Sequence, residues 1–427
     1  MRMKNVDGRK WARSIWPAFV VVAGLLLAGC EPRELLSAVS LAPEDISPNA
    51  DGVADATRIA YRLGRNATVS IFFQSDGDTR RYFRNAQPRS AGEYAVLFSG
   101  VIDGRLLPDG VYRWVVDATD DAGQSQSIEG TLRLSGGETT PPEILRWTIQ
   151  PKVFTPNRDG ISDRATINFY LNKSAALYVT LQNALCNGST TPPAGSPDLN
   201  CTPFPLAERA STGETRKPGE EGLHEFDYDA GVDLGADPPP DGLYVVTARV
   251  EDAVGQVATV TDTLEIEGGG VPRAEIVDGQ VEFSTRSAIL GDTMYFTLTV
   301  ENYGAVPIRT SGPLSGYVYS DANQTFAWPG YAEQSGVFRV GIGFETMKTN
   351  YPFRWAIGGA ADLVVQEIDG QPYYYLPPGR RATVTGGIKL TEVPARNPVR
   401  FFGALIHEDV QMVNQNVDPN PVLITKP

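Results

Sequence analysis

The sequence predicts an all-β protein built from several antiparallel β-sandwich domains. Its 427 residues include 43 glycines and 32 prolines, which recur between short apolar runs and so favour strands joined by turns. Apolar and polar residues alternate with a period of two in runs such as 57–63 and 244–250, which is typical of half-buried strands. At roughly 100–200 residues per domain, a chain of this length predicts two to four domains.

Residues 1–29 form a predicted lipoprotein signal peptide. A basic segment precedes the short apolar run 19–28, which is far below the ~20 residues that a membrane-spanning helix needs. The run ends in Leu27-Ala28-Gly29-Cys30, which resembles the lipobox of bacterial lipoproteins. The resemblance implies that Cys30 carries a diacylglycerol, that the signal is cleaved before it, and that residues 30–35 tether the chain to a membrane. An ordinary signal peptide with a chance cysteine is the alternative.

The two other cysteines, Cys186 and Cys201, flank one short loop, and export makes a disulfide between them permissible. Closing a loop of about 15 residues contributes about 3 kcal/mol in the chain-entropy model. A zinc site is the weaker interpretation, because two cysteines alone do not make a zinc ligand set. We therefore expect a Cys186–Cys201 disulfide.

An internal repeat defines the first two domains, 36–135 and 143–267. The run ISPNADGVAD at 46–55 matches FTPNRDGISD at 154–163 without a gap. Farther along, the run PDGVY at 108–112 matches PDGLY at 240–244. The two anchors lie farther apart in the second copy, which therefore contains an insertion, and we place the cysteine loop in it. Runs rich in Gly and Pro, at 135–142 and 268–272, read as linkers.

These repeated motifs resemble a known family. Pro-Asn-x-Asp-Gly-x-x-Asp, a later Pro-Asp-Gly-x-Tyr and a closing Asp-x-x-Gly-Gln are similar to the Ig-like domain of the flagellar hook-cap protein, whose relatives occur in many secreted bacterial proteins. The resemblance covers about residues 36–267, in two copies, and implies tandem Ig-like antiparallel β-sandwiches. It implies no flagellar function, since nothing in the chain matches the assembly segment with which the hook-cap protein begins.

Residues 273–427 form a predicted third sandwich without the repeated motif. Gly291-Asp292, an alternating strand at 294–300, the run VENYG at 300–304 and the turn LPPG at 376–379 occur in that order. This order resembles the bacterial cell-adhesion-type Ig-like domain. The middle, roughly 311–372, departs from the pattern, although 338–344 still reads as a strand.

The repeated Asn/Asp turns carry the candidate metal ligands. Oxygen side chains alternate and are followed by Gly, as in part of a calcium loop; they are Asn49, Asp51 and Asp55 in the first copy and Asn157, Asp159 and Asp163 in the second. The closing bidentate Glu of such a loop is absent, because Arg58 or Thr166 occupies its place. A self-hydrogen-bonded structural turn is therefore the favoured interpretation, and calcium binding is the alternative.

An aromatic run in the third domain is the candidate ligand platform. Tyr373, Tyr374 and Tyr375 are consecutive, so in a strand the first and third face one way and the second the other. Aromatic residues are common strand formers, so packing is the favoured interpretation and stacking on sugar rings the alternative. The same two interpretations apply to Trp328, Tyr331, Phe353 and Trp355.

Charge and residue types narrow the function. The net charge of −14 argues against nucleic-acid binding, which needs clustered Lys and Arg. The only histidines are His224 and His407, and His-Glu-x-x-His and Gly-x-Ser-x-Gly motifs are absent, so we expect no enzyme. A glycosidase that uses a carboxylate pair stays open, since Asp and Glu are plentiful.

We therefore expect a lipid-anchored scaffold or adhesion module that binds another envelope protein through its third domain. A lipoprotein that binds polysaccharide or cell wall is the alternative.

Overall fold

The computed structural model describes residues 34–75, 77, 79–209, 218–325 and 334–427. They form strands joined by turns, with three short 3-10 helices, η1 (Ala184–Cys186), η2 (Val232–Leu234) and η3 (Val277–Gly279). The chain divides into two compact units, Met1–Pro141 with Asp252–Val257, and Pro142–Glu251 with Ala258–Pro427. The second unit thus holds both the body of the second repeat and the third domain. The predicted all-β class is confirmed.

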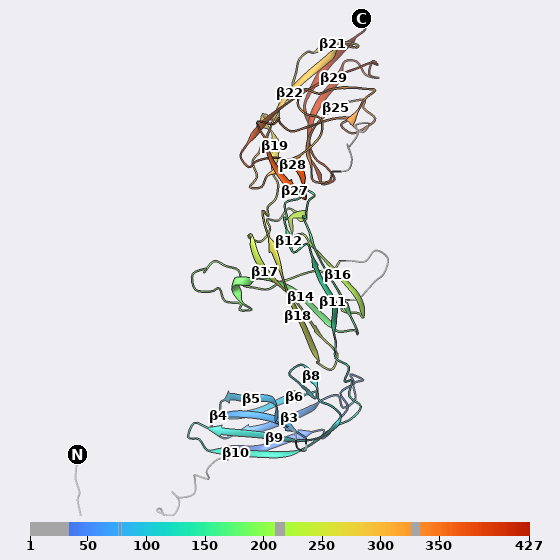
Figure 1. The fold of residues 1–427 in the computed structure, drawn as a ribbon. Coiled ribbons are helices and arrows are strands. Elements are labelled where there is room, and N and C mark those ends of the chain that lie inside the picture. Colours follow the sequence, from blue (N-terminus) through green and yellow to red (C-terminus); the bar gives the residue numbers. More distant parts are fainter. Residues whose placement is uncertain (1–33, 76, 78, 210–217, 326–333) are drawn as a thin grey trace, which may run out of the picture. The chain divides into compact units, whose positions relative to one another are not determined.

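The first repeat is a sandwich of two sheets (Figure 1). A three-stranded sheet has the order β1-β3-β6, and a five-stranded sheet has the order β2-β10-β9-β4-β5. Its strands are β1 (Leu36–Ala42), β2 (Asp45–Ile46), β3 (Thr57–Leu63), β4 (Ala67–Gln74), β5 (Arg81–Arg89), β6 (Gly92–Phe98), β7 (Val101–Ile102), β8 (Arg105–Leu106), β9 (Gly110–Asp120) and β10 (Ser125–Leu134). Leu35 already belongs to the buried core between the sheets, just before the predicted boundary at 36.

The second repeat has the same sheet order. Its three-stranded sheet is β11-β13-β16, and its five-stranded sheet is β12-β18-β17-β14-β15. Its strands are β11 (Ile144–Gln150), β12 (Val153–Phe154), β13 (Ala165–Leu171), β14 (Ala176–Asn183), β15 (Phe204–Pro205), β16 (Gly222–Tyr228), β17 (Gly242–Glu251) and β18 (Val257–Ile266). The predicted insertion lies between β14 and β16, on both sides of β15, which stands where the longer β5 stands in the first copy. The cysteine loop is its first part, between β14 and β15.

The Pro-Asp-Gly-x-Tyr motif closes each repeat in the same way. The hydroxyl of Tyr112 donates to the carbonyl of Pro108 over 2.8 Å, and that of Tyr244 donates to the carbonyl of Pro240 over 2.8 Å. The aspartate of the motif accepts hydrogen bonds from the first two glycine amides of the following linker, Gly136 and Gly137 in one copy and Gly268 and Gly269 in the other. The motif therefore fixes both its own strand and the start of the linker.

The third domain has larger sheets than the repeats. One sheet has the order β19-β22-β29-β24, with β20 beside β22, and the other has the order β21-β31-β30-β25-β23-β28-β27, with β26 beside β25. The strands are β19 (Ala274–Ile276), β20 (Glu282–Phe283), β21 (Ser287–Ile289), β22 (Thr293–Asn302), β23 (Ile308–Thr310), β24 (Val318–Ser320), β25 (Phe338–Phe344), β26 (Phe353–Ala356), β27 (Val364–Ile368), β28 (Gln371–Leu376), β29 (Arg381–Lys389), β30 (Val399–His407) and β31 (Gln411–Thr425). The predicted strand at 338–344 is confirmed as β25.

Candidate functional site

Cys30, the predicted lipid attachment point, lies outside the described residues, as does the predicted signal peptide, residues 1–29. Within the described part of the chain, no helix is long and apolar enough to cross a membrane.

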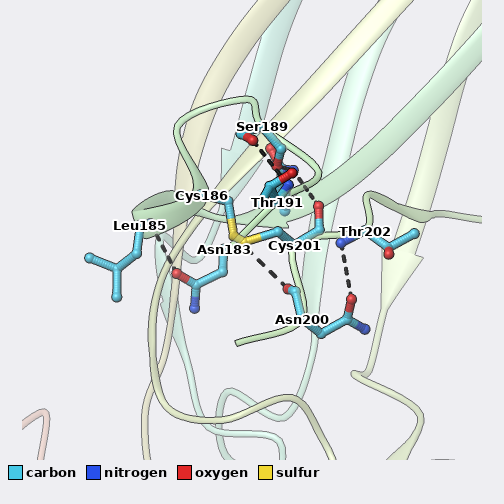
Figure 2. Close-up of a disulfide and its surroundings, with 9 residues drawn as sticks. Asn183, Leu185, Cys186, Ser189, Thr191, Asn200, Cys201 and Thr202 are labelled. Carbon is cyan, nitrogen blue, oxygen red and sulfur yellow. Dashed lines mark hydrogen bonds between the residues drawn. A yellow bond between two sulfur atoms is a disulfide. The ribbon is translucent and has the colours of Figure 1, made fainter. Parts of the chain in front are cut away.

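The predicted disulfide joins Cys186 to Cys201 across a sequence separation of 15 (Figure 2). Both cysteines are buried, and their Cα atoms are 5.5 Å apart. Gln182 Nε2 donates to the carbonyls of Ser189 and Cys201, over 2.8 and 2.6 Å, and so ties the loop to the end of β14. The pairing prediction is confirmed, and the bond fastens the insertion that only the second repeat has.

The Asn/Asp turn of the first repeat is hydrogen-bonded to itself. The Asp55 carboxylate accepts from the amides of Asn49, Ala50 and Gly52 over 3.2, 2.8 and 2.7 Å. Asp51 Oδ1 accepts from the amide of Val53 over 2.8 Å. Desolvation raises the pKa of Asp55, but these amides together lower it by more, so it lies below its ordinary value of 3.8. The side-chain oxygens thus serve the backbone of their own turn, which is exposed.

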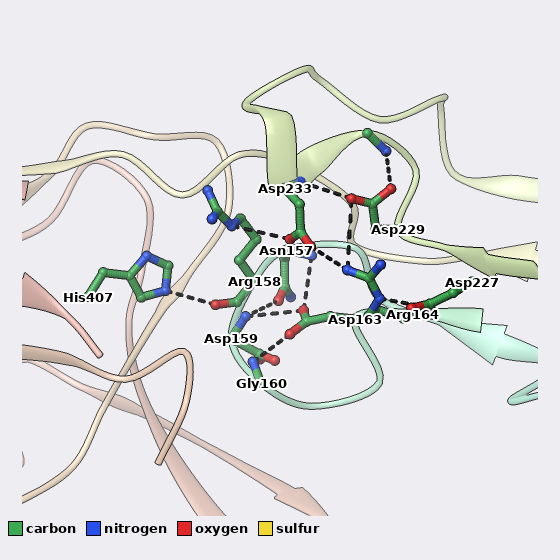
Figure 3. A network of polar contacts seen from close by, with 11 residues as sticks. Asn157, Arg158, Asp159, Gly160, Asp163, Arg164, Asp227, Asp229, Asp233 and His407 are labelled. Carbon is green, nitrogen blue, oxygen red and sulfur yellow. Dashed lines mark hydrogen bonds and ion pairs between the residues drawn. The ribbon is translucent and has the colours of Figure 1, made fainter. Parts of the chain in front are cut away.

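The second copy makes the same turn in a different environment (Figure 3). Asp163 accepts from the amides of Asn157, Asp159 and Gly160 over 3.3, 3.1 and 2.6 Å. Asp159 Oδ1 accepts from the amide of Ile161 over 2.8 Å, as Asp51 does from Val53. Here, however, Asp159 is only 5% exposed, because the third domain covers it. Matching local motifs therefore have different tertiary partners.

Two side chains of the third domain bind this second turn. The hydroxyl of Tyr375, on β28, donates to Asp159 Oδ2 over 2.8 Å. His407 Nε2, at the end of β30, lies 2.8 Å from the carbonyl oxygen of Arg158 and donates to it (Figure 3). The His407 ring also stacks on Phe338, with 4.0 Å between ring centroids. We call the turn Asn157–Asp163 together with Tyr375 and His407 the junction.

Two glycines let the backbones of the junction meet. Gly160 and Gly336 both have positive φ, +81° and +82°. A Cβ on Gly160 would overlap the carbonyl of Ser335, and a Cβ on Gly336 would overlap the backbone of Asp159. Any side chain at either position would therefore push the turn away from the third domain.

Burial shifts the ionisation of the junction. Burial, followed by the charge of Asp159, raises the pKa of Asp163 from 3.8 to about 6. Burial also raises the pKa of Asp159, although the Tyr375 hydrogen bond opposes this. Burial lowers the pKa of His407 from 6.5 to about 4, so this histidine is neutral at pH 7.

The candidate calcium ligands of both turns already accept hydrogen bonds. All six candidate side chains accept hydrogen bonds from backbone amides of their own turn. In the part of the chain that the structure describes, no group of three or more His, Cys, Asp or Glu residues could hold a metal ion. The side-chain oxygens therefore stabilise the backbone of their own turn, and calcium binding stays a prediction.

The tyrosine run divides as strand alternation requires. Tyr375 faces inward and is 2% exposed, whereas Tyr374 is 44% exposed. Tyr373 is half-buried beneath the Arg309 guanidinium, whose central carbon lies 5.5 Å from the ring centroid. Phe353 and Trp355 belong to the buried core, while Trp328 and Tyr331 lie outside the described residues.

A polar cleft of about 510 Å³ opens beside the junction. Its lining includes Gly160 of the second repeat and, from the third domain, Arg309, Ser311, Gln334, Gln371 and Tyr373. Sequence reasoning singled out Tyr373 but not Arg309, whose only local signal is a charge in the middle of the three-residue strand β23. The structure therefore joins the tyrosine run and the Asn/Asp turn, which the sequence analysis treated as separate sites.

The two histidines have separate environments. His224 is fully buried in the second repeat, where its ring nitrogens lie 2.7 Å from Glu208 Oε1 and 2.7 Å from the carbonyl oxygen of Glu220. His407 belongs to the junction.

Comparison with known proteins found no matching family profile and no matching curated protein. Solved structures that resemble the chain include a tetra-tandem repeat from the extending region of a large adhesion protein, at 11% identity, with 91% of this chain and 72% of that one covered and a TM-score of 0.20. A Ca²⁺-stabilised, ice-binding adhesin of an Antarctic bacterium has 13% identity, coverage of 92% and 74%, and a TM-score of 0.23. The eight N-terminal Ig domains of Down Syndrome Cell Adhesion Molecule have 11% identity, coverage of 92% and 48%, and a TM-score of 0.23. Likenesses this weak carry no functional argument, and the sandwich assignment rests on the sheets described above.

Proposed function

We propose that the chain is a non-enzymatic envelope lipoprotein, anchored to a membrane by lipid on Cys30, which acts as a scaffold or adhesion module for another envelope protein. One observation carries this proposal. Two repeats of identical sheet order precede a third sandwich with different sheets, which supplies most of the lining of a cleft. Repetition suits a spacer, whereas a distinct last domain suits recognition.

The proposed location is outside the cytoplasm, at the cell surface or in a periplasm. Its supports are the basic and apolar segments before Cys30 and the Cys186–Cys201 disulfide, since disulfides persist in oxidising compartments.

Anchoring is tested by Cys30→Ser. The variant should leave the membrane fraction and lose labelling by a fatty-acid probe. The matched control, Cys186→Ser with Cys201→Ser, should stay in the membrane fraction and stay labelled. Unchanged labelling of the Cys30→Ser protein would refute the anchor.

Recognition is tested by deletion and capture from solubilised envelopes. Removing 273–427 should abolish capture of the partner while export and anchoring persist. Removing 36–135, as the control, should leave capture intact. If the chain without 273–427 still captures its partner, binding resides in the repeats and the assignment is wrong.

A second candidate function is the binding of polysaccharide or cell wall. The polar cleft favours it, because the half-buried Tyr373 and the exposed Tyr374 line the cleft together with side chains that bear amides and hydroxyls. Retention on insoluble glycans, lost on Tyr373→Ala, would support this function over the first.

A further inference from the structure

Arg309 is a nearly buried cation without an anionic partner among the described residues. It lies in β23 and is 7% exposed. Its Nη2 donates to the carbonyl of Ser335 over 2.6 Å, and this is its one hydrogen bond to the described residues. Its Nε is buried without an acceptor, and no described carboxylate lies within ion-pairing distance of its guanidinium. Most of its donors therefore lack an acceptor in the described part of the chain.

No surrounding carboxylate among the described residues forms an ion pair with the Arg309 guanidinium. Asp159 is near enough for the charge of Arg309 to lower its pKa, but Tyr375 and the amide of Ile161 occupy its oxygens. Asp233 pairs with a different arginine, Arg158 of the turn, at 3.5 Å. A guanidinium removed from water without a paired anion is unfavourable, and an anion that enters beside it relieves that cost.

The cleft around Arg309 has the size and lining of a small-ligand site. Its volume of about 510 Å³ lies within the range of ordinary ligand pockets. Apart from Arg309, the lining is uncharged, with the amides of Gln334 and Gln371 and the hydroxyl of Ser311. Neither the Gln371 amide nor the Ser311 hydroxyl is bonded to another described residue. These groups both donate and accept, as the hydroxyls of a sugar require.

From this arrangement we infer that the cleft binds an acidic sugar residue, with its carboxylate on the Arg309 guanidinium and its ring against Tyr373. The planar guanidinium fork matches a carboxylate in a bidentate manner. One unpaired cation matches a single negative charge, and the amides and hydroxyls of the lining match the sugar hydroxyls. The inference rests on the second proposed function and specifies its ligand class.

The second repeat completes this site. Gly160 forms part of the cleft wall, and a Cβ there would lie 3.2 Å from Arg309 Nη2 as well as overlapping the carbonyl of Ser335. The cleft therefore depends on the docking of the Asn157–Asp163 turn, and the repeat contributes to recognition as well as to spacing.

The test compares matched sugars on the intact full chain by calorimetry. The probes are a galacturonic acid tetrasaccharide, its carboxyl-reduced neutral counterpart and a glutamate tetrapeptide. We expect the acidic sugar to bind about tenfold or more tightly than the reduced one, since charge-assisted hydrogen bonds are stronger than neutral ones. Added salt should weaken the binding of the acidic sugar and leave that of the reduced sugar unchanged. This comparison needs no variant, so it does not depend on how substitutions fold.

Variants then assign the effect to the cleft. Arg309→Met should bind the acidic and reduced sugars equally, and Arg309→Lys should retain part of the preference. Tyr295→Phe, at an exposed tyrosine of β22 that does not line the cleft, should match the wild type. Unfolding curves confirm that each variant is folded. Equal binding of both sugars by the wild type, abolished by Tyr373→Ala, would overturn the acidic-sugar inference and leave sugar binding standing. Binding of neither sugar would overturn both, and preference for the glutamate peptide would replace the sugar with an acidic peptide.

Discussion

Removing the Tyr375 hydroxyl should destabilise the junction, and more so at neutral than at acidic pH. The hydroxyl donates over 2.8 Å to Asp159 Oδ2, and the two residues are 2% and 5% exposed. Tyr375→Phe leaves this buried carboxylate oxygen without its donor. Hydrogen bonds to charged groups are worth about 1.5–3 kcal/mol, so we expect a loss of about 2 kcal/mol at pH 8.

The pH dependence follows from the same contact. The Tyr375 hydrogen bond lowers the pKa of Asp159 against the raising effect of burial, so the variant raises that pKa further. A group whose folded pKa is raised destabilises the fold above that pKa, and the cost disappears as pH falls and the carboxyl takes up a proton. The difference between variant and wild type should therefore shrink between pH 8 and pH 4.5.

Native-state hydrogen exchange of peptides from β28 measures this local stability, after correction for intrinsic exchange at each pH. Tyr374→Phe is the matched control, because its ring is exposed on the same strand, and it should change stability by less than about 0.5 kcal/mol. In an Asp159→Asn background, Tyr375→Phe should cost less than in the wild type. Equal effects of the two tyrosine variants, or a penalty that grows toward acid, would refute the reasoning.

The remaining predictions concern the rest of the site. Burial lowers the pKa of His407 from 6.5 to about 4, so its contribution to stability is lost as pH falls through that window. The pKa of Asp163 is raised from 3.8 to about 6, so protonation of its carboxyl stabilises the folded state over nearly the same pH range. Asp163→Asn removes this opposing effect and should increase the loss of folding free energy between pH 7 and pH 4.5 by up to about 3 kcal/mol, measured by urea titration at both pH values. Cys186→Ser with Cys201→Ser should lower the free energy of unfolding of the second repeat by at most about 3 kcal/mol relative to the oxidised wild type, measured by calorimetry, and a reduced wild-type sample should match the variant. Calcium chelation should leave the melting temperature unchanged, and a drop that Asp51→Ala with Asp159→Ala removes would restore the calcium interpretation.

Local sequence determined the strands, the turns and the disulfide. The alternation in Thr57–Leu63 specifies which side chains face the core, and the residues that form the Asn/Asp turn lie within six positions of one another. The turn therefore forms in both copies, with the closing aspartate accepting from the equivalent amides of Asn49 and Gly52 or Asn157 and Gly160. Cys186 and Cys201 had one partner each once Cys30 was assigned to lipid, so their pairing also followed from the sequence.

Only the tertiary structure decided which copy of the turn is buried and what surrounds Arg309. Asp51 and Asp159 occupy equivalent places in matching motifs, but the partner of Asp159 is 216 residues away and that of Arg158 is 249 residues away. Arg309 likewise reads locally as one charge in a short strand, and its desolvation comes from segments remote in sequence. Hydrogen bonds within a turn depend on neighbouring residues, whereas burial, and with it the ionisation of Asp163 and His407, depends on which distant surfaces meet.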